Sequence, residues 1–179
     1  MAKHHVFLHI GPDVVEIGVE VRERLASAGV RTPDASREDL YRAGLEIRRD
    51  HKAAGLKRKD VEGAWARVCR KTHRTRSDAF ISAPGFFDAD ADQAALAVDG
   101  LGGLKVHLVV TAQARADLPT AWTRLVKPQR VHVVGPGLSS GEFADELAQI
   151  ALSEEKTRLD KALIKVKRRR KQVKRQLAA

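Results

Sequence analysis

The chain has 179 residues, of which 43% are hydrophobic, and its 33 Lys and Arg residues against 23 Asp and Glu residues give a net charge of +10. This aliphatic content is enough for a normal core, which excludes a body that is disordered, collagen-like or coiled coil throughout. The single cysteine, Cys69, excludes an intramolecular disulfide, and no apolar run approaches the roughly 20 residues that span a bilayer. We therefore expect a cytoplasmic protein with no membrane span, built from one domain of roughly 150 residues and an appendage.

The first half of the chain predicts one strand and three helices. Residues 5–10 form a β-rich apolar run that ends at Gly11-Pro12, which predicts a buried strand followed by a turn. Apolar residues then recur at helical spacing over 13–29, between an aspartate that can cap a helix and a glycine that can end one. Amphipathic patterns over 36–50 and 59–73 predict two further helices.

The second half of the chain alternates between strand and helix patterns. Three short β-rich runs, 79–82, 106–110 and 131–134, predict strands, and helical patterns near 90–98 and 117–126 separate them. An alternation of buried strands with helices implies βαβ units. The predicted fold class is therefore α/β, with a mostly parallel sheet flanked by helices.

After Gly135-Pro136-Gly137 the sequence predicts one long helix, which Ser139 or Ser140 can cap. About 37 residues at about 1.5 Å each would reach roughly 55 Å, so the distal end should project beyond the body. We therefore divide the chain into an α/β domain, 1–138, and a long C-terminal helix, 139–179, whose distal part is strongly basic. An apolar stripe at three-four spacing also allows a gapped coiled coil, and through it a homodimer. The stripe consists of Leu152, Leu159, Leu163, Val166, Val173 and Leu177.

Five segments, taken in order along the chain, resemble one family. They are Val6-Phe7-Leu8-His9-Ile10-Gly11-Pro12, Gly63-Ala64-Trp65, Ala79-Phe80-Ile81-Ser82, Val109-Val110-Thr111-Ala112 and Leu118-Pro119-Thr120-Ala121-Trp122. Their order and spacing are similar to those of actinobacterial sulfotransferase-like proteins over roughly residues 5–135. The resemblance implies a P-loop-like α/β fold and, as the cofactor of the family, the sulfate donor PAPS.

The same resemblance places the functional positions of the family at residues that do not suit its chemistry. The turn after the first strand, where the family has a Lys and small residues that cradle the phosphosulfate, holds no cation here and carries two acids. The position of a His-Glu pair holds Ala83-Pro84, which cannot exchange a proton. Gln113, with Arg115 nearby, stands where an Arg would contact the 3′-phosphate of the nucleotide. We therefore expect no catalytic residue and no bound cofactor. The degenerate donor-site positions are Gly11, Pro12, Asp13, Glu16, Gln113 and Arg115.

The histidines and the cysteine predict neither a metal site nor a nucleophile. His5 with His9, or His107 with His132, could face one another on neighbouring strands, but neither pair belongs to a zinc motif. We interpret these residues as structural or surface histidines, and Cys69 as a partly buried thiol on a helix.

Two basic zones stand out from a mildly acidic remainder. Residues 48–76 hold eleven basic and three acidic side chains, and residues 161–175 hold nine basic and no acidic ones. Because a solvated helix usually mixes the two signs, so many like charges indicate an external polyanion. The candidate contacts of the C-terminal zone are Lys161, Lys165, Lys167, Arg168, Arg169, Arg170, Lys171, Lys174 and Arg175. Those of the first zone are Lys57, Arg58, Lys59, Arg70, Lys71, Arg74 and Arg76.

These observations predict a non-catalytic sulfotransferase-like domain that binds nucleic acid or a nucleoprotein assembly through its basic C-terminal helix. The distal tail contains no aromatic residue that could stack on single-stranded bases, so duplex DNA or structured RNA is the expected ligand. One alternative is a sulfotransferase or related transferase of anionic substrates, which would use PAPS and a cationic pocket built from residues such as Arg115 or Lys127. Another is a helix-mediated protein-protein interaction or dimerisation module.

Overall fold

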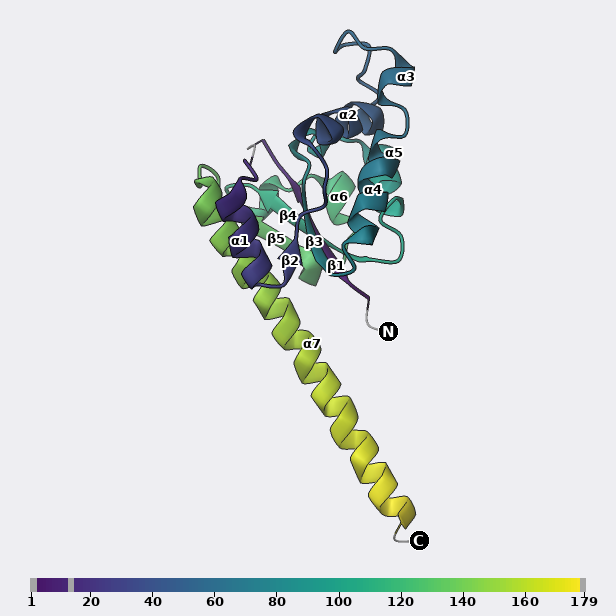
Figure 1. Cartoon of the computed structure of the whole chain (residues 1–179), viewed down its shortest axis with the longest axis vertical. Coiled ribbons are helices and arrows are strands. Elements are labelled where there is room, and N and C mark those ends of the chain that lie inside the picture. Colours follow the sequence, from purple (N-terminus) through teal and green to yellow (C-terminus); the bar gives the residue numbers. More distant parts are fainter. Residues whose placement is uncertain (1–2, 13–14, 178–179) are drawn as a thin grey trace.

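A five-stranded, all-parallel sheet forms the centre of the molecule (Figure 1). The computed structural model describes residues 3–12 and 15–177, without the side chain of Arg115. The spatial order of the strands is β2-β3-β1-β4-β5. This sheet and its flanking helices confirm the α/β class predicted from the sequence. The strands are β1 (His5–Ile10), β2 (Val30–Arg31), β3 (Asp78–Ser82), β4 (Lys105–Thr111) and β5 (Val131–Val134).

Helices cover both faces of the sheet. Side chains of β1 alternate between two cores, because Val6, Leu8 and Ile10 point to one face and Phe7 to the other. The core around Phe7 is closed by α1 (Val19–Ser27) and the first half of α7 (Ser140–Leu177). The opposite core is closed by α2 (Arg37–Arg48), α4 (Ala64–Arg74), α5 (Ala91–Asp99) and α6 (Thr120–Thr123), and the short α3 (Arg58–Val61) precedes α4.

The helices of the first half differ in extent from the sequence prediction. α1 begins only at Val19, and the helix predicted over 59–73 is divided into α3 and α4. Gly63 takes a positive φ of 73° at the break. The two carboxylate oxygens of Glu46 on α2 accept hydrogen bonds from the backbone N–H groups of Gly63 (2.6 Å) and Trp65 (2.7 Å). A side chain distant in sequence therefore supplies the N-terminal cap that the local sequence of α4 lacks.

The edge strand β2 and the connection between β4 and β5 also differ from the sequence prediction. The sequence does not predict β2, because two residues are too few to give a periodic signal. The helix predicted over 117–126 is reduced to the 3-10 turn η2 (Arg115–Asp117) and α6, since Pro119 disfavours a helical conformation of the residue before it. The other single turns are η1 (Pro84–Phe86) and η3 (Pro128–Arg130).

α7 begins on the outer side of the body, beside α1, and ends far from the body (Figure 1). Its start is capped reciprocally, because the Glu142 carboxylate accepts from the Ser139 N–H (2.9 Å) and Ser139 Oγ accepts from the Glu142 N–H (3.3 Å). Phe143 and Leu147 are buried in the core shared with α1, whereas all residues over 159–177 are exposed. The predicted projection is confirmed, and the first half of the helix belongs to the packed body. None of the helices in the described parts of the chain is both long and apolar enough to cross a membrane.

Candidate nucleic-acid interface and neighbouring sites

The distal half of α7 carries all nine basic residues that the sequence assigns to its C-terminal zone. Each of these side chains, from Lys161 to Arg175, is exposed. Among the described residues, the ion pairs of α7 extend no further along the helix than Arg158. The positive charge of the tail is therefore not neutralised within the described molecule, and it is available to an external anion.

This charge surrounds the helix. At 3.6 residues per turn, each residue is rotated by about 100° from the one before it, so the five consecutive basic residues over 167–171 point in all directions around the axis. The zone from Lys161 to Arg175 extends for roughly 21 Å along the helix. Helices that lie on bilayers keep their charges on one side, opposite bulky apolar anchors. A rod that is charged all round is better suited to a groove between phosphate chains.

The structure divides the first basic zone between two ends of the body. Residues 57–59 are exposed at the start of α3, at the end of the molecule opposite to the tail (Figure 1). Arg74 and Arg76 are exposed just before β3, whose first residue, Asp78, has its Oδ1 atom 3.9 Å from Nη1 of Arg158 on α7. Of these two groups, only Arg74 and Arg76 therefore lie near the point where α7 leaves the body and could extend the basic surface of the tail.

Lys71 on α4 is held in an ion pair, whereas its neighbour Arg70 is exposed. Lys71 Nζ lies 2.9 Å from Oδ2 of Asp39 on α2, and the same oxygen accepts from the backbone N–H of Ser36 (3.0 Å). The hydrogen bond from Lys71, and after it the one from Ser36, holds the pKa of Asp39 below its ordinary value. This geometry favours a structural role for Lys71, which ties α4 to the start of α2.

We expect Asp39→Asn to lower the free energy of unfolding near neutral pH by about 1 kcal/mol, because helix caps and partly exposed ion pairs contribute about this much. Since the folded state depresses the pKa of Asp39, its contribution is present above the unfolded value of about 3.9 and is lost as the pH falls through that value and below it. Urea unfolding of both proteins near pH 7 and near pH 3 tests this. A difference of equal size at both pH values would contradict the assignment.

The glycine that ends the first strand is needed for packing. An ideal Cβ on Gly11 would lie 3.0 Å from Cβ of Thr111 on β4, which is tighter than nine in ten Cβ contacts in proteins. The neighbouring Pro12 is exposed, and Asp13 lies outside the described residues. Gly11 thus accounts for a tight turn over β4, a role that needs no bound phosphate.

The other donor-site positions lie in loops at the carboxyl edge of the sheet. Glu16 is exposed, and its backbone N–H donates to Oγ of Ser140 on α7 at 3.2 Å. Because α1 begins at Val19, an acid stands just before the helix N-terminus where a bound anion would need a cation. Gln113 is exposed after β4, and Arg115 begins η2.

A cavity of about 580 Å³ opens at the carboxyl ends of β2 and β3, between α2 and the loop that follows β1. The chain leaves β1 toward the face of α1 and leaves β3 toward the opposite face, and such a divergence of neighbouring strands creates a crevice. Arg22 of α1 and Arg37 and Arg48 of α2 line this cavity, together with Glu16 and Ser82. The arrangement can accept a small molecule that carries an anionic group.

Sequence reasoning missed these arginines and named Arg115 and Lys127 for a cationic pocket instead. Lys127 is not among the residues that line the described cavity, and the side chain of Arg115 lies outside the described part of the chain. The sequence carries no local signal for this cavity. The strand order does indicate it, because α/β sheets bind ligands at the carboxyl edge where the connections of neighbouring strands leave toward opposite faces.

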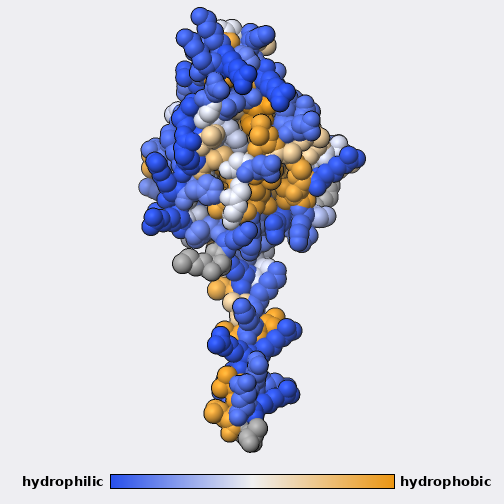
Figure 2. All heavy atoms as spheres, turned by 90° about the vertical axis from the view of Figure 1, so that its right-hand side faces the viewer, coloured by the Kyte–Doolittle hydropathy of each residue, from blue (hydrophilic) through white to orange (hydrophobic). Residues whose placement is uncertain are grey.

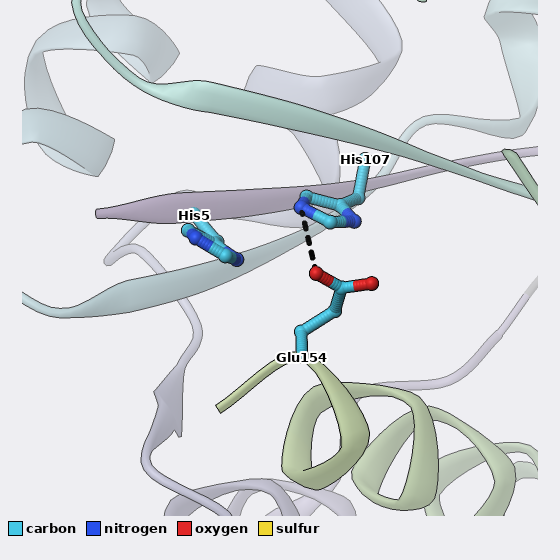
Figure 3. Close-up of side chains that lie close together, drawn as sticks. All are labelled: His5, His107 and Glu154. Carbon is cyan, nitrogen blue, oxygen red and sulfur yellow. Dashed lines mark ion pairs between the residues drawn. The ribbon is translucent and has the colours of Figure 1, made fainter. Parts of the chain in front are cut away.

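Three side chains from distant parts of the sequence converge near the amino edge of the sheet, where α7 leaves the body (Figure 3). His5 of β1 stacks on His107 of β4, with their ring centroids 4.7 Å apart. Nε2 of His107 lies 4.0 Å from Oε2 of Glu154 on α7, and its Nδ1 lies 3.0 Å from Nε2 of His132 on β5. The prediction from the sequence included a contact between His107 and His132, but it did not include a contact of His107 with His5 or Glu154.

His9 and Cys69 both have structural surroundings. The ring nitrogens of His9 lie 3.0 Å from Ser82 Oγ and 2.8 Å from Thr111 Oγ1, so His9 bonds to the two strands beside β1 and not to His5. Cys69 is buried on α4, and this burial raises the pKa of its thiol to about 12. The thiol is therefore protonated at neutral pH and is no nucleophile.

Comparisons with protein-family models, with curated proteins and with solved structures give no match to this chain.

Proposed function

We propose that the protein binds nucleic acid, alone or within a nucleoprotein assembly, through the distal half of α7. The single observation that supports this function best is the combination of charge and exposure in that segment. From Lys161 to Arg175, nine basic side chains and no acidic one project into solvent on a continuous helix, beyond the last intramolecular ion pair found in the described residues. The phosphate backbone of a duplex is the polyanion that such an array fits best.

The expected recognition is electrostatic and largely independent of sequence. Neutralising phosphates with Lys and Arg releases condensed counterions, which gives an affinity that falls steeply with salt. Specific readout needs contacts to base edges, and single-strand binding needs aromatic side chains on which bases stack. Since the described tail beyond Phe143 offers no aromatic side chain, duplex DNA or structured RNA is the proposed ligand.

The competing interpretation is a dimer through α7, and such a dimer would place basic side chains of the two copies close together. The stripe from Leu152 to Leu177 is exposed, and Figure 2 shows hydrophobic atoms among hydrophilic ones along the projecting helix. A second copy packed on this stripe would bring Arg170, within the seam, and Lys167, Arg169 and Lys174, at its borders, close to identical charges. Such repulsion favours an anionic partner over a second tail, and light scattering of the full chain distinguishes a monomer from a dimer.

Fluorescence anisotropy of labelled duplex DNA and hairpin RNA, titrated with the full chain at several salt concentrations, tests the proposal. We expect the logarithm of the association constant to fall against the logarithm of the salt concentration with a slope of about −5, which corresponds to roughly six neutralised phosphates on DNA. Binding that ignores salt, or the absence of binding at low salt, would contradict the proposed function. Anionic vesicles in a parallel titration would reveal a preference for membranes.

A second candidate function is the binding of a small anionic ligand in the cavity that Arg22, Arg37 and Arg48 line. This is the location that a transferase of anionic substrates would use, and PAPS is the probe that the family resemblance suggests. Calorimetric titration with PAPS tests it. Saturable binding that Arg37→Ala reduces would support this second function, and the absence of binding would count against a transferase that uses PAPS.

We also propose that the protein acts in the cytoplasm. A single cysteine, which is buried as a free thiol, fits a reducing compartment.

A further inference from the structure

The side chains of His5, His107 and Glu154 gather at one point although they belong to β1, β4 and α7 (Figure 3). One ligand atom from each lies within 4.8 Å of the others. A tetrahedral zinc ion with bonds of about 2.0 to 2.1 Å holds its ligand atoms roughly 3.3 Å apart. To bind a common ion, the ligand atoms must therefore approach one another by up to about 1.5 Å, and the stacked rings of His5 and His107, whose planes differ by 19°, must turn toward one point.

Two buried nitrogen atoms of this cluster have no hydrogen-bond partner in the structure. They are Nδ1 of His5 and Nε2 of His107, on side chains that are almost completely buried. When His107 donates from Nδ1 to His132, its Nε2 carries a lone pair that faces the carboxylate of Glu154 at 4.0 Å. Two acceptors that face each other in a buried place are stabilised by a cation between them.

We propose that His5, His107 and Glu154 form a binding site for a divalent transition-metal ion, best suited to Zn²⁺, at the point where α7 leaves the sheet. Two imidazole nitrogens and one carboxylate are a ligand set that zinc proteins use with a fourth position left for water. Glu154 is half-buried, so this fourth position can face solvent. His132 would hold the ring of His107 in the orientation for binding, as partners of metal-bound histidines generally do.

Two cations lie close to the cluster. Nζ of Lys105 lies 3.4 Å from Nε2 of His5. Arg158 is paired with two carboxylates, Asp78 at 3.9 Å and Glu155, so the charge of Arg158 is largely compensated before a metal ion enters.

A bound metal ion is expected to hold the part of α7 around Glu154 against the sheet. Glu154 lies three residues beyond Ala151, the last fully buried residue of α7, and five residues before the fully exposed segment 159–177. A metal ion shared by β1, β4 and α7 would join these elements beyond the reach of the hydrophobic core. This inference does not depend on nucleic-acid binding.

The full chain, freed of metal with a chelator, should be titrated with Zn²⁺ by calorimetry and with Co²⁺ by its visible absorption. We expect one ion per chain, a Co²⁺ spectrum of tetrahedral type, and no comparable binding of Mg²⁺, which prefers oxygen ligands. Glu154→Gln and His5→Ala should each weaken the affinity at least about tenfold. Glu154→Gln changes a half-buried residue and is expected to keep the fold even if a histidine variant does not.

Two matched controls separate this site from adventitious binding. Glu146→Gln removes an exposed carboxylate from the same helix, and His73→Ala removes an exposed imidazole from α4. Neither should change the affinity for Zn²⁺ by more than about twofold, and at equal concentration Zn²⁺ should raise the melting temperature of both controls more than that of Glu154→Gln. The proposal fails if Zn²⁺ does not bind, or if Glu154→Gln binds it as tightly as Glu146→Gln does.

Discussion

Replacing Arg168, Arg169, Arg170 and Lys171 together by Gln should weaken duplex binding at least about 30-fold at moderate salt and make the salt dependence shallower by about four units of slope. The reason is that each lost cation removes one neutralised phosphate and the counterions released with it. These side chains are exposed and lie beyond the packed part of α7. The free energy of unfolding should therefore change by less than about 0.5 kcal/mol.

A matched variant in the first basic zone provides the control. Lys57→Gln, Arg58→Gln, Lys59→Gln and Arg70→Gln together remove the same charge from exposed positions of the body. If the tail is the binding element, this variant should lose no more than about threefold in affinity. Equal losses in both variants would mean that net charge, and not the position of the tail, governs binding. A chain ending at residue 160 should reproduce the tail variant.

Trp122→Ala should lower the free energy of unfolding by about 3 to 5 kcal/mol, a large loss for a single substitution. Trp122 is completely buried on α6 and stacks on Phe86 with ring centroids 6.0 Å apart. Its Nε1–H donates to the carbonyl oxygen of Phe86 at 3.0 Å, and the backbone N–H of Ala89 donates to the same oxygen at 3.1 Å. The truncation therefore leaves a cavity and removes one of the two hydrogen bonds that this buried carbonyl accepts.

Urea unfolding near neutral pH measures this loss, and two other variants make it interpretable. Trp122→Phe keeps most of the ring volume but removes the donor, and it should cost less than Trp122→Ala. Leu125→Ala, two residues after α6 at a half-exposed position, should cost less than about 1 kcal/mol. A Trp122→Ala protein as stable as Leu125→Ala would show that the core around Phe86 does not depend on this ring.

The sequence was sufficient to predict elements whose signal is local. The apolar runs of β1, β3 and β4 lie in the centre of a parallel sheet, where both faces are buried and strands are mostly apolar. The short β-branched run of β5 was also found, although β5 is an edge strand whose middle residues are partly buried. The projection of α7 followed from its length. Elements that depend on distant partners were not predictable, and the break between α3 and α4 is the clearest case, since Glu46 of α2 caps it.

The candidate sites follow the same rule. The basic tail was found because charge composition is a property of a contiguous segment. The metal cluster was not found because His5 and His107 meet only through the pairing of β1 with β4, and Glu154 joins them only when α7 lies across that face of the sheet. No spacing along the chain encodes such a meeting, which depends on strand register and on helix packing.

Because α7 is continuous, it connects the tail to the body as a rigid helix and not as a flexible linker. After Gly141 the helix contains neither Gly nor Pro, and the same rod starts beside the loop that follows β1, where Ser140 Oγ accepts from the Glu16 N–H, and ends in the basic segment. A partner that binds the distal segment therefore also fixes the orientation of the arginine-lined cavity relative to that partner. Inserting one residue near 160 would rotate the body by about 100° and shift it by about 1.5 Å relative to the bound distal segment.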